Sequence, residues 1–183
     1  ADPFVEDHIS PMVGSLLSAS VGNRALCEEL SLRLGARGWS IFTTSTRKAR
    51  LERLADMLAT AWRRRREYEV AQVDVFSGPA FTWAEAVCWL LDRLGKPYSL
   101  VLRGGKLPEF AARSPRRVRR LLSAAQAVVA PSTYLQQELA PYRGDIALIP
   151  NAVDLAEYPF RLRERPQSNL VWLRSFHSIY NPS

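Results

Sequence analysis

The chain has 183 residues, of which 47% are hydrophobic and 23% are charged, and its formal net charge is +7. This composition is typical of a globular domain and excludes a disordered chain, and no apolar stretch reaches the roughly 20 residues that span a bilayer. The two cysteines, Cys27 and Cys88, lie far apart without metal-ligand spacing. We therefore expect reduced, buried thiols and no metal site.

Short apolar runs alternate with amphipathic segments along the chain. The apolar runs predict six strands, at Ile9–Gly14, Trp39–Thr44, Ala71–Phe76, Tyr98–Leu102, Ala127–Ala130 and Ile146–Ile149. The amphipathic segments predict five helices, at about Asn23–Ala36, Leu51–Arg66, Thr82–Leu94, Pro115–Ala125 and Thr133–Leu139. Alternation with short links gives parallel strands joined by right-handed crossovers. The predicted fold class is therefore α/β, a doubly wound parallel sheet of the Rossmann-like type.

Local signals set several of these helix boundaries. Gly95 followed by Pro97 is a strong stop for the third helix. Thr133 with Gln136 predicts a capping box that opens the fifth helix. The Pro115–Ala125 helix is expected to place its leucines and valine in the core and its arginines in solvent; these are Val118, Leu121 and Leu122, and Arg116, Arg117, Arg119 and Arg120.

The domain organisation follows from changes in composition. Residues 1–8 show neither an initiator Met nor a signal-peptide pattern, and we treat them as a terminal segment outside the fold. The Rossmann-like domain is expected at 9–160, followed by a charged, proline-containing linker at 161–169. A new apolar run, Leu170–Leu173, then begins, so residues 170–183 are expected to open a second domain. We expect the chain to be an incomplete piece of a two-domain protein.

Polar or small-residue loops follow the predicted strands, and in an open α/β sheet such loops share the edge at which ligands bind. The first loop offers backbone N–H groups near a helix start, and a later loop combines two glycines with two cations, which suits an oxyanion or phosphate. The candidate binding residues are Gly14, Ser15, Gly22, Asn23, Ser77, Gly78, Phe81, Gly104, Gly105, Lys106 and Ser132. Arg103, beside the glycine pair, is the candidate for a role at the reacting centre.

The order of these loops, from Gly14 to the end of the chain, resembles the acceptor-side half of family 4 glycosyltransferases, which are retaining enzymes of the two-domain GT-B fold. The resemblance implies a nucleotide-sugar donor, no cofactor, and a sugar or lipid-linked acceptor bound by the 9–160 domain. It implies that Arg174 pairs with the donor diphosphate and that Arg103 stands where the family commonly has His. The missing C-terminal domain would hold the donor, so the chain alone is expected to be inactive. A cytoplasmic location is expected, peripheral to the membrane if the acceptor is lipid-linked.

Two other functions stay open. Seven basic residues and one acid lie between Arg103 and Arg120, so a non-catalytic Rossmann-like module that binds an anionic polymer or membrane surface is the first alternative. Nucleic acid is disfavoured because the basic patches lack interleaved aromatic residues and no known nucleic-acid motif is present. The second alternative is another α/β enzyme that binds a phosphorylated small molecule at the same edge. The second basic cluster, Arg63–Arg66, is interpreted as a solvated helix face.

Overall fold

The computed structural model describes residues 9–13, 26–44, 49–151 and 162. Residues 1–151 form one compact unit and residues 152–183 another. The predicted linker at 161–169 and the predicted second domain at 170–183 thus lie outside the described residues, apart from Leu162. The fold below is that of the first unit.

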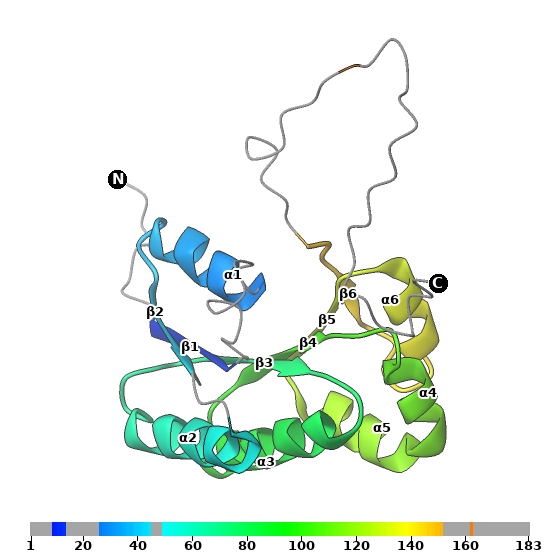
Figure 1. Ribbon diagram of the computed structural model, residues 1–183, viewed down its shortest axis with the longest axis horizontal. Helices are drawn as coiled ribbons and strands as arrows, with labels where there is room; N and C mark the ends of the chain where they lie inside the picture. The colour runs from blue at the N-terminus through cyan, green and yellow to red at the C-terminus, as the bar shows by residue number, and fades with distance from the viewer. Residues whose placement is uncertain (1–8, 14–25, 45–48, 152–161, 163–183) are drawn as a thin grey trace. The chain divides into compact units, whose positions relative to one another are not determined.

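Among the described residues, six strands form one sheet (Figure 1). They are β1 (Ile9–Val13), β2 (Ser40–Thr44), β3 (Ala71–Val75), β4 (Tyr98–Leu102), β5 (Ala127–Ala130) and β6 (Ala147–Leu148). Their order is β2-β1-β3-β4-β5-β6, and every neighbouring pair is parallel. The predicted α/β class and parallel sheet are confirmed.

Pro11 lies inside β1, where a proline would normally interrupt a strand that is paired on both sides. The register explains why it is accepted. Pro11 is opposite Phe42 of β2, whereas the pairing with β3 includes only Met12 and Val13. Pro11 therefore precedes the region in which β1 is paired on both sides.

Six helices connect the strands within the described residues. They are α1 (Leu26–Gly35), α2 (Arg50–Arg63), α3 (Pro79–Arg93), α4 (Leu107–Arg113), α5 (Pro115–Ala124) and α6 (Thr133–Leu139). Helices α2, α3 and α5 cover one face of the sheet and α1 lies on the other (Figure 1). The order of the strands reverses direction between β1 and β3, and this reversal requires helices on both faces.

The sequence did not predict α4. Its glycine-rich approach and Pro108 indicate a loop, but proline is well tolerated in the first turn of a helix, where its missing N–H would have no partner. Leu107 and Ala111 then share a buried face of the helix. The spacing of these two residues was the signal available in the sequence.

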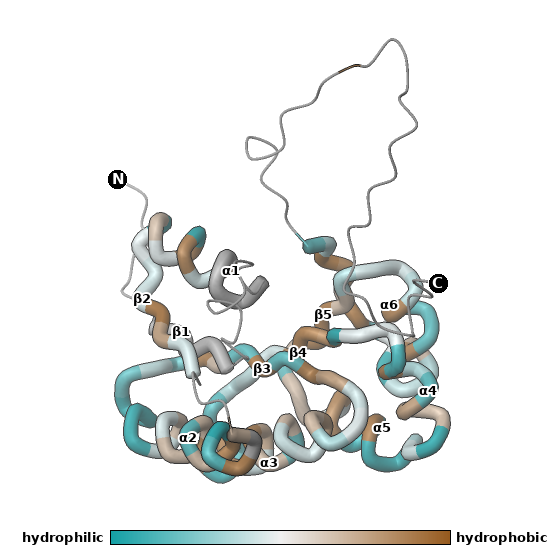
Figure 2. The backbone as a smooth tube through the Cα atoms, viewed as in Figure 1, coloured by the Kyte–Doolittle hydropathy of each residue, from teal (hydrophilic) through white to brown (hydrophobic). Residues whose placement is uncertain are grey.

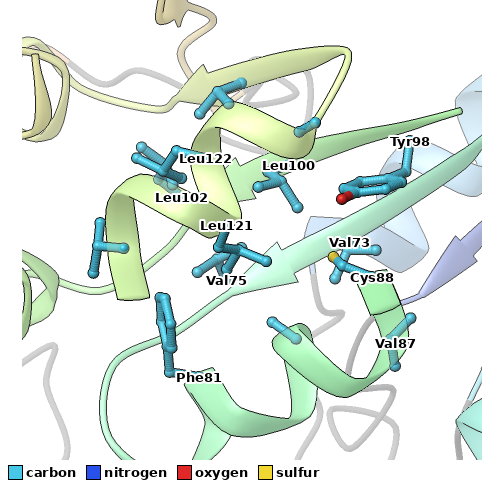
Figure 3. Packing of buried hydrophobic residues seen from close by; sticks show 14 of the residues in the cluster. Val73, Val75, Phe81, Val87, Cys88, Tyr98, Leu100, Leu102, Leu121 and Leu122 are labelled. Carbon is cyan, nitrogen blue, oxygen red and sulfur yellow. The ribbon is translucent and has the colours of Figure 1, made fainter. Parts of the chain in front are cut away.

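Part of the core lies between the sheet and the helices α3 and α5 (Figure 3), and α4 and α6 contribute Leu107, Ala111, Leu135 and Leu139 to the same cluster. Val73 and Val75 alternate with more exposed residues along β3, whereas β4 is buried through Leu100, Val101 and Leu102. A strand covered on both faces has a continuous apolar sequence. Figure 2 shows β4 and β5 as hydrophobic, whereas hydrophobic and hydrophilic residues alternate along the helices. On α5, the predicted core residues Val118, Leu121 and Leu122 are all buried.

Arg143 joins the end of α5 to the chain that precedes β6. Its guanidinium donates to the carbonyl oxygens of Leu122, Ala125 (2.6 Å) and Gln126 (3.3 Å), and its Nε donates to Asp145 at 2.6 Å. The last carbonyls of a helix lack partners within the helix, and a cation there also suits the helix dipole. Arg143 therefore caps α5 from a distant part of the sequence.

Candidate functional site

Because all six strands are parallel, their carboxyl ends lie at one edge of the sheet. This edge carries the loops that follow β3, β4, β5 and β6, as the sequence predicted. Val13 ends β1 at the same edge, beside the reversal of strand order at which ligands bind in such sheets. The candidates in the loop after β1, Gly14, Ser15, Gly22 and Asn23, lie outside the described residues, as does Arg174.

Arg103 follows β4 and is held by two side chains from other parts of the sheet. Its Nε donates to Asp74 Oδ1 at 3.4 Å, and its Nη1 donates to Asn151 Oδ1 at 2.9 Å. Asp74 belongs to β3 and Asn151 follows β6. The backbone N–H of Arg103 also donates to the carbonyl of Val75 at 2.8 Å. The guanidinium is thus fixed in position at the centre of the edge.

The pair of Arg103 and Asp74 is largely removed from solvent, with side chains 12% and 9% exposed. Burial raises the pKa of Asp74 above its ordinary value, and the charge and hydrogen bond of Arg103 act in the opposite direction. Without Arg103 the carboxylate would be a buried, uncompensated charge. Each side chain therefore compensates the buried charge of the other.

The loop after Arg103 exposes its backbone. Gly104 has a φ of 84°, in the left-handed region that favours glycine, and Gly104, Gly105 and Lys106 are all exposed. Lys106 is the N-cap residue of α4 and makes no side-chain capping bond. This loop places one fixed and one exposed cation beside bare backbone, a combination that suits oxyanions.

The loop after β3 was predicted to contribute three binding residues, and the structure places one of them in the core. Ser77 and Gly78 lie at the edge, and Gly78 adopts φ 70° and ψ −143°, which only glycine adopts readily. Phe81, in contrast, is 0% exposed and packs on Phe110 with ring centroids 4.7 Å apart. Its burial is at odds with the predicted contact of Phe81 with the acceptor, because the ring supports α3 and α4 from inside the core.

Ser132 caps α6, since its Oγ accepts a hydrogen bond from the N–H of Leu135 at 3.3 Å. The predicted capping box of Thr133 and Gln136 is wrong. Gln136 instead donates to the carbonyl of Ile146 at 2.8 Å, so it joins α6 to the chain before β6. The cap was displaced by one residue because Thr133 already has helical geometry.

The arginines of α5 were predicted to face solvent, and one of the four does not. Arg116, Arg119 and Arg120 are exposed as predicted, but Arg117 is half-buried and paired with Glu85 of α3. Its Nε donates to Glu85 Oε1 at 3.1 Å, its Nη2 contacts the other carboxylate oxygen, and its guanidinium lies 5.6 Å from the centre of the Phe81 ring. Arg117 therefore holds α5 against α3.

The sequence did not identify the partners of Arg103. These partners, Asp74 and Asn151, lie 29 positions before and 48 positions after Arg103 in the chain. Asp74 alternates with the buried residues Val73 and Val75 along β3, so its place in the strand did not distinguish it from an exposed polar residue. No cluster of metal-ligating side chains occurs in the described part of the chain.

Residues 22–157 match the family described as Glycosyltransferase Family 4, which is most of the chain. The protein therefore belongs to glycosyltransferase family 4, and the observed α/β sheet fits the Rossmann-like domain of such proteins. This confirms the resemblance read from the loops and indicates a function of the glycosyltransferase type. No curated protein matches the sequence. Within the described residues, no helix is both long and apolar enough to cross a membrane.

Proposed function

We propose that this domain binds the acceptor in a retaining glycosyltransferase that uses a nucleotide-sugar donor and no cofactor. The acceptor is a sugar or a lipid-linked molecule, and the protein works in the cytoplasm. The observation that carries the proposal is the Asp74–Arg103–Asn151 group at the carboxyl edge of a family 4 domain. It fixes a cation beside the exposed backbone of Gly104 and Gly105.

The chemistry of Arg103 limits its role. A guanidinium stays protonated near neutral pH, so it cannot act as a general base. It can donate hydrogen bonds to oxygens that gain negative charge as the bond to the donor phosphate breaks. Because Asp74 and Asn151 hold it, little reorganisation is needed when that charge develops. We therefore assign Arg103 to charge stabilisation and acceptor positioning, with Lys106 as the exposed second cation.

The test is sugar transfer by the active protein that contains this domain. Arg103→Lys keeps the charge but loses the planar guanidinium that donates through several nitrogens. The kcat should therefore fall about a hundredfold, as for loss of one oxyanion donor. Arg66→Lys, an exposed arginine away from the edge, is the matched control and should leave kcat unchanged. Equal activity of both variants would remove Arg103 from the reacting centre.

Nucleotide-sugar binding tests which domain holds the donor. In the enzymes that this chain resembles, the donor is held mainly by a second domain. The resemblance assigns Arg174 of this chain to the donor diphosphate. The chain as given should therefore bind a nucleotide-sugar only weakly in calorimetry and show no transfer. Micromolar binding by this chain would place the donor site within the domain described above.

A membrane role is the second candidate, favoured by the exposed arginines of α5. Arg116, Arg119 and Arg120 offer about 1 kcal/mol each near an anionic surface. Flotation with vesicles that contain phosphatidylglycerol tests it. Arg116→Gln with Arg119→Gln should reduce binding, whereas the matched double variant Arg63→Gln with Arg66→Gln should not. Binding that is unaffected by salt or by the first pair would exclude this surface.

A further inference from the structure

An open groove of about 460 Å³ lies between α3 and α5, on the face of the sheet that these two helices cover. Its α3 wall is formed by Thr82, Glu85, Trp89 and Asp92, which recur at intervals of three and four residues and so share one side of the helix. Arg120 and Leu121 line it from α5. The volume is within the range of small-molecule sites. The carboxyl-edge loops contribute no lining residue.

Trp89 is the main aromatic surface of the groove. The residue is 58% exposed although it is large and apolar. The guanidinium of Arg93 lies 5.1 Å from the centre of its ring, which covers one face and restrains the ring. An exposed, restrained aromatic ring is a good platform for the apolar face of a ligand, because little side-chain entropy is lost on binding.

Hydrogen-bonding groups lie on both sides of this ring along α3. Asp92 accepts a hydrogen bond from the hydroxyl of Tyr98 at 3.4 Å, and Glu85 is paired with Arg117. A carboxylate has about four acceptor positions, so both retain capacity for further donors. Arg120, whose side chain is 81% exposed, supplies donors from the opposite wall.

The floor between these groups is uncharged. Cys88 and Tyr98 line the groove and lie close to each other in Figure 3. Burial raises the pKa of Cys88 to about 12. The thiol is therefore neutral at physiological pH. Leu121 completes the apolar floor.

The balance of charge decides between two kinds of ligand. A tryptophan between two carboxylates would suit an organic cation. Here, however, Glu85 is already compensated by Arg117, Arg120 lies 4.0 Å from it, and Arg93 occupies a face of Trp89. A further cation would meet these arginines. A neutral polyhydroxyl ligand meets no such repulsion, since its hydroxyls can donate to the carboxylates and accept from the arginine.

From this combination we infer that the α3–α5 groove is a saccharide-binding site, separate from the carboxyl-edge site and sized for one or two sugar units. The sugar ring places its C–H face on Trp89 and its hydroxyls on Asp92, Glu85 and Arg120. The site lies on a different surface from the reacting centre proposed above. Its occupancy therefore does not depend on the proposed transfer reaction.

The experiment follows the indole N–H signals of ¹⁵N-labelled protein during titration with maltotriose, cellotriose and chitotriose. Trp89→Phe assigns the signal of Trp89. That signal should shift in a saturable way with at least one saccharide, at a dissociation constant of about 1 mM for so open a site. Trp89→Ala should weaken binding about tenfold, the loss expected for one aromatic contact, and Arg120→Gln should weaken it as well.

Trp62→Ala is the matched control. Trp62 is 52% exposed on α2 and carries Arg65 at 4.7 Å from its ring centre, but it lies outside the groove. Binding that Trp89→Ala leaves unchanged, or equal shifts at Trp62 and Trp89, would overturn the proposal. So would the absence of any shift at Trp89 with all three saccharides. A response of Trp89 to phosphatidylglycerol vesicles without a response to saccharides would identify a membrane contact instead.

Discussion

Arg103 and Asp74 show how one residue at the edge of the sheet depends on another that is 29 positions earlier in the chain. Burial raises the pKa of Asp74, so between its ordinary pKa and its pKa in the fold the folded state binds more protons than the unfolded state. The free energy of unfolding therefore falls as pH rises through that range. Arg103 limits this loss, because its charge lowers the pKa.

Arg103→Met should raise the pKa of Asp74 further and extend the loss of stability to higher pH. At neutral pH the variant should lose about 3 kcal/mol of unfolding free energy, as expected when one partner of a buried ion pair is removed. Below the ordinary pKa of aspartate, Asp74 is protonated in both states and the difference should shrink. Carboxyl NMR titration and urea unfolding at several pH values measure both effects.

The double variant Arg103→Met with Asp74→Asn is the control. It removes the titrating group, so the additional pH dependence that Arg103→Met introduces through Asp74 should disappear. If the single variant were equally destabilised at acid and neutral pH, its cost would come from lost packing and not from the charge of Asp74.

Among the elements, α6 shows how one displaced cap alters a prediction. Both Ser132 and Thr133 are residues that cap helices, and only the observed backbone distinguishes them. Ser132→Ala should cost about 1 kcal/mol of stability because the N–H of Leu135 loses its acceptor. Thr133→Ala is the matched control, with a change within about 0.5 kcal/mol at this exposed position. Thermal unfolding of the two variants compares them, and a larger loss for Thr133 would restore the predicted capping box.

The glycine pair before α4 allows an equally direct comparison. Gly104 has positive φ, and a Cβ there would lie 3.9 Å from the Phe76 ring, so backbone strain and not a clash would oppose a side chain. Gly104→Ala should cost about 1 kcal/mol. Gly105→Ala, with no positive φ and no atom within 4 Å of the added Cβ, should be neutral or slightly stabilising. Unfolding in urea measures both, and equal values would show that the loop relaxes around Gly104.

At the scale of the whole molecule, Arg143 connects elements that the chain order separates. Its side chain is 12% exposed, and its guanidinium donates to the carbonyls at the end of α5 and pairs with Asp145. Arg143→Met should cost about 3 kcal/mol, since charge-assisted bonds are lost and carbonyls lose their donor. Hydrogen exchange should speed up in the last turn of α5 and in β6 more than in β3 and β4.

The exposed Arg119 of α5 is the matched control, and Arg119→Met should change stability by less than about 0.5 kcal/mol. Uniform acceleration of exchange throughout the sheet in Arg143→Met would mean that Arg143 stabilises the whole unit and not the junction of α5 with β6. An unchanged stability would contradict its role as a cap.

The sequence alone determined the α/β class, the approximate bounds of the strands and the shared edge of the loops. These features depend on the periodicity of apolar residues and on turn residues, which are local in sequence. Even Pro11 did not prevent the recognition of β1. The order of the loops was sufficient to identify family 4, which the match over residues 22–157 confirmed.

Only the tertiary structure decided which polar groups meet. Arg103 could not be assigned to Asp74 and Asn151, nor Arg117 to Glu85, because those contacts depend on how distant elements are packed. The burial of Phe81 was hidden for the same reason, since an aromatic at a helix start is compatible with either core or surface. The groove between α3 and α5 has no counterpart in the sequence, because a cavity is a property of two packed surfaces.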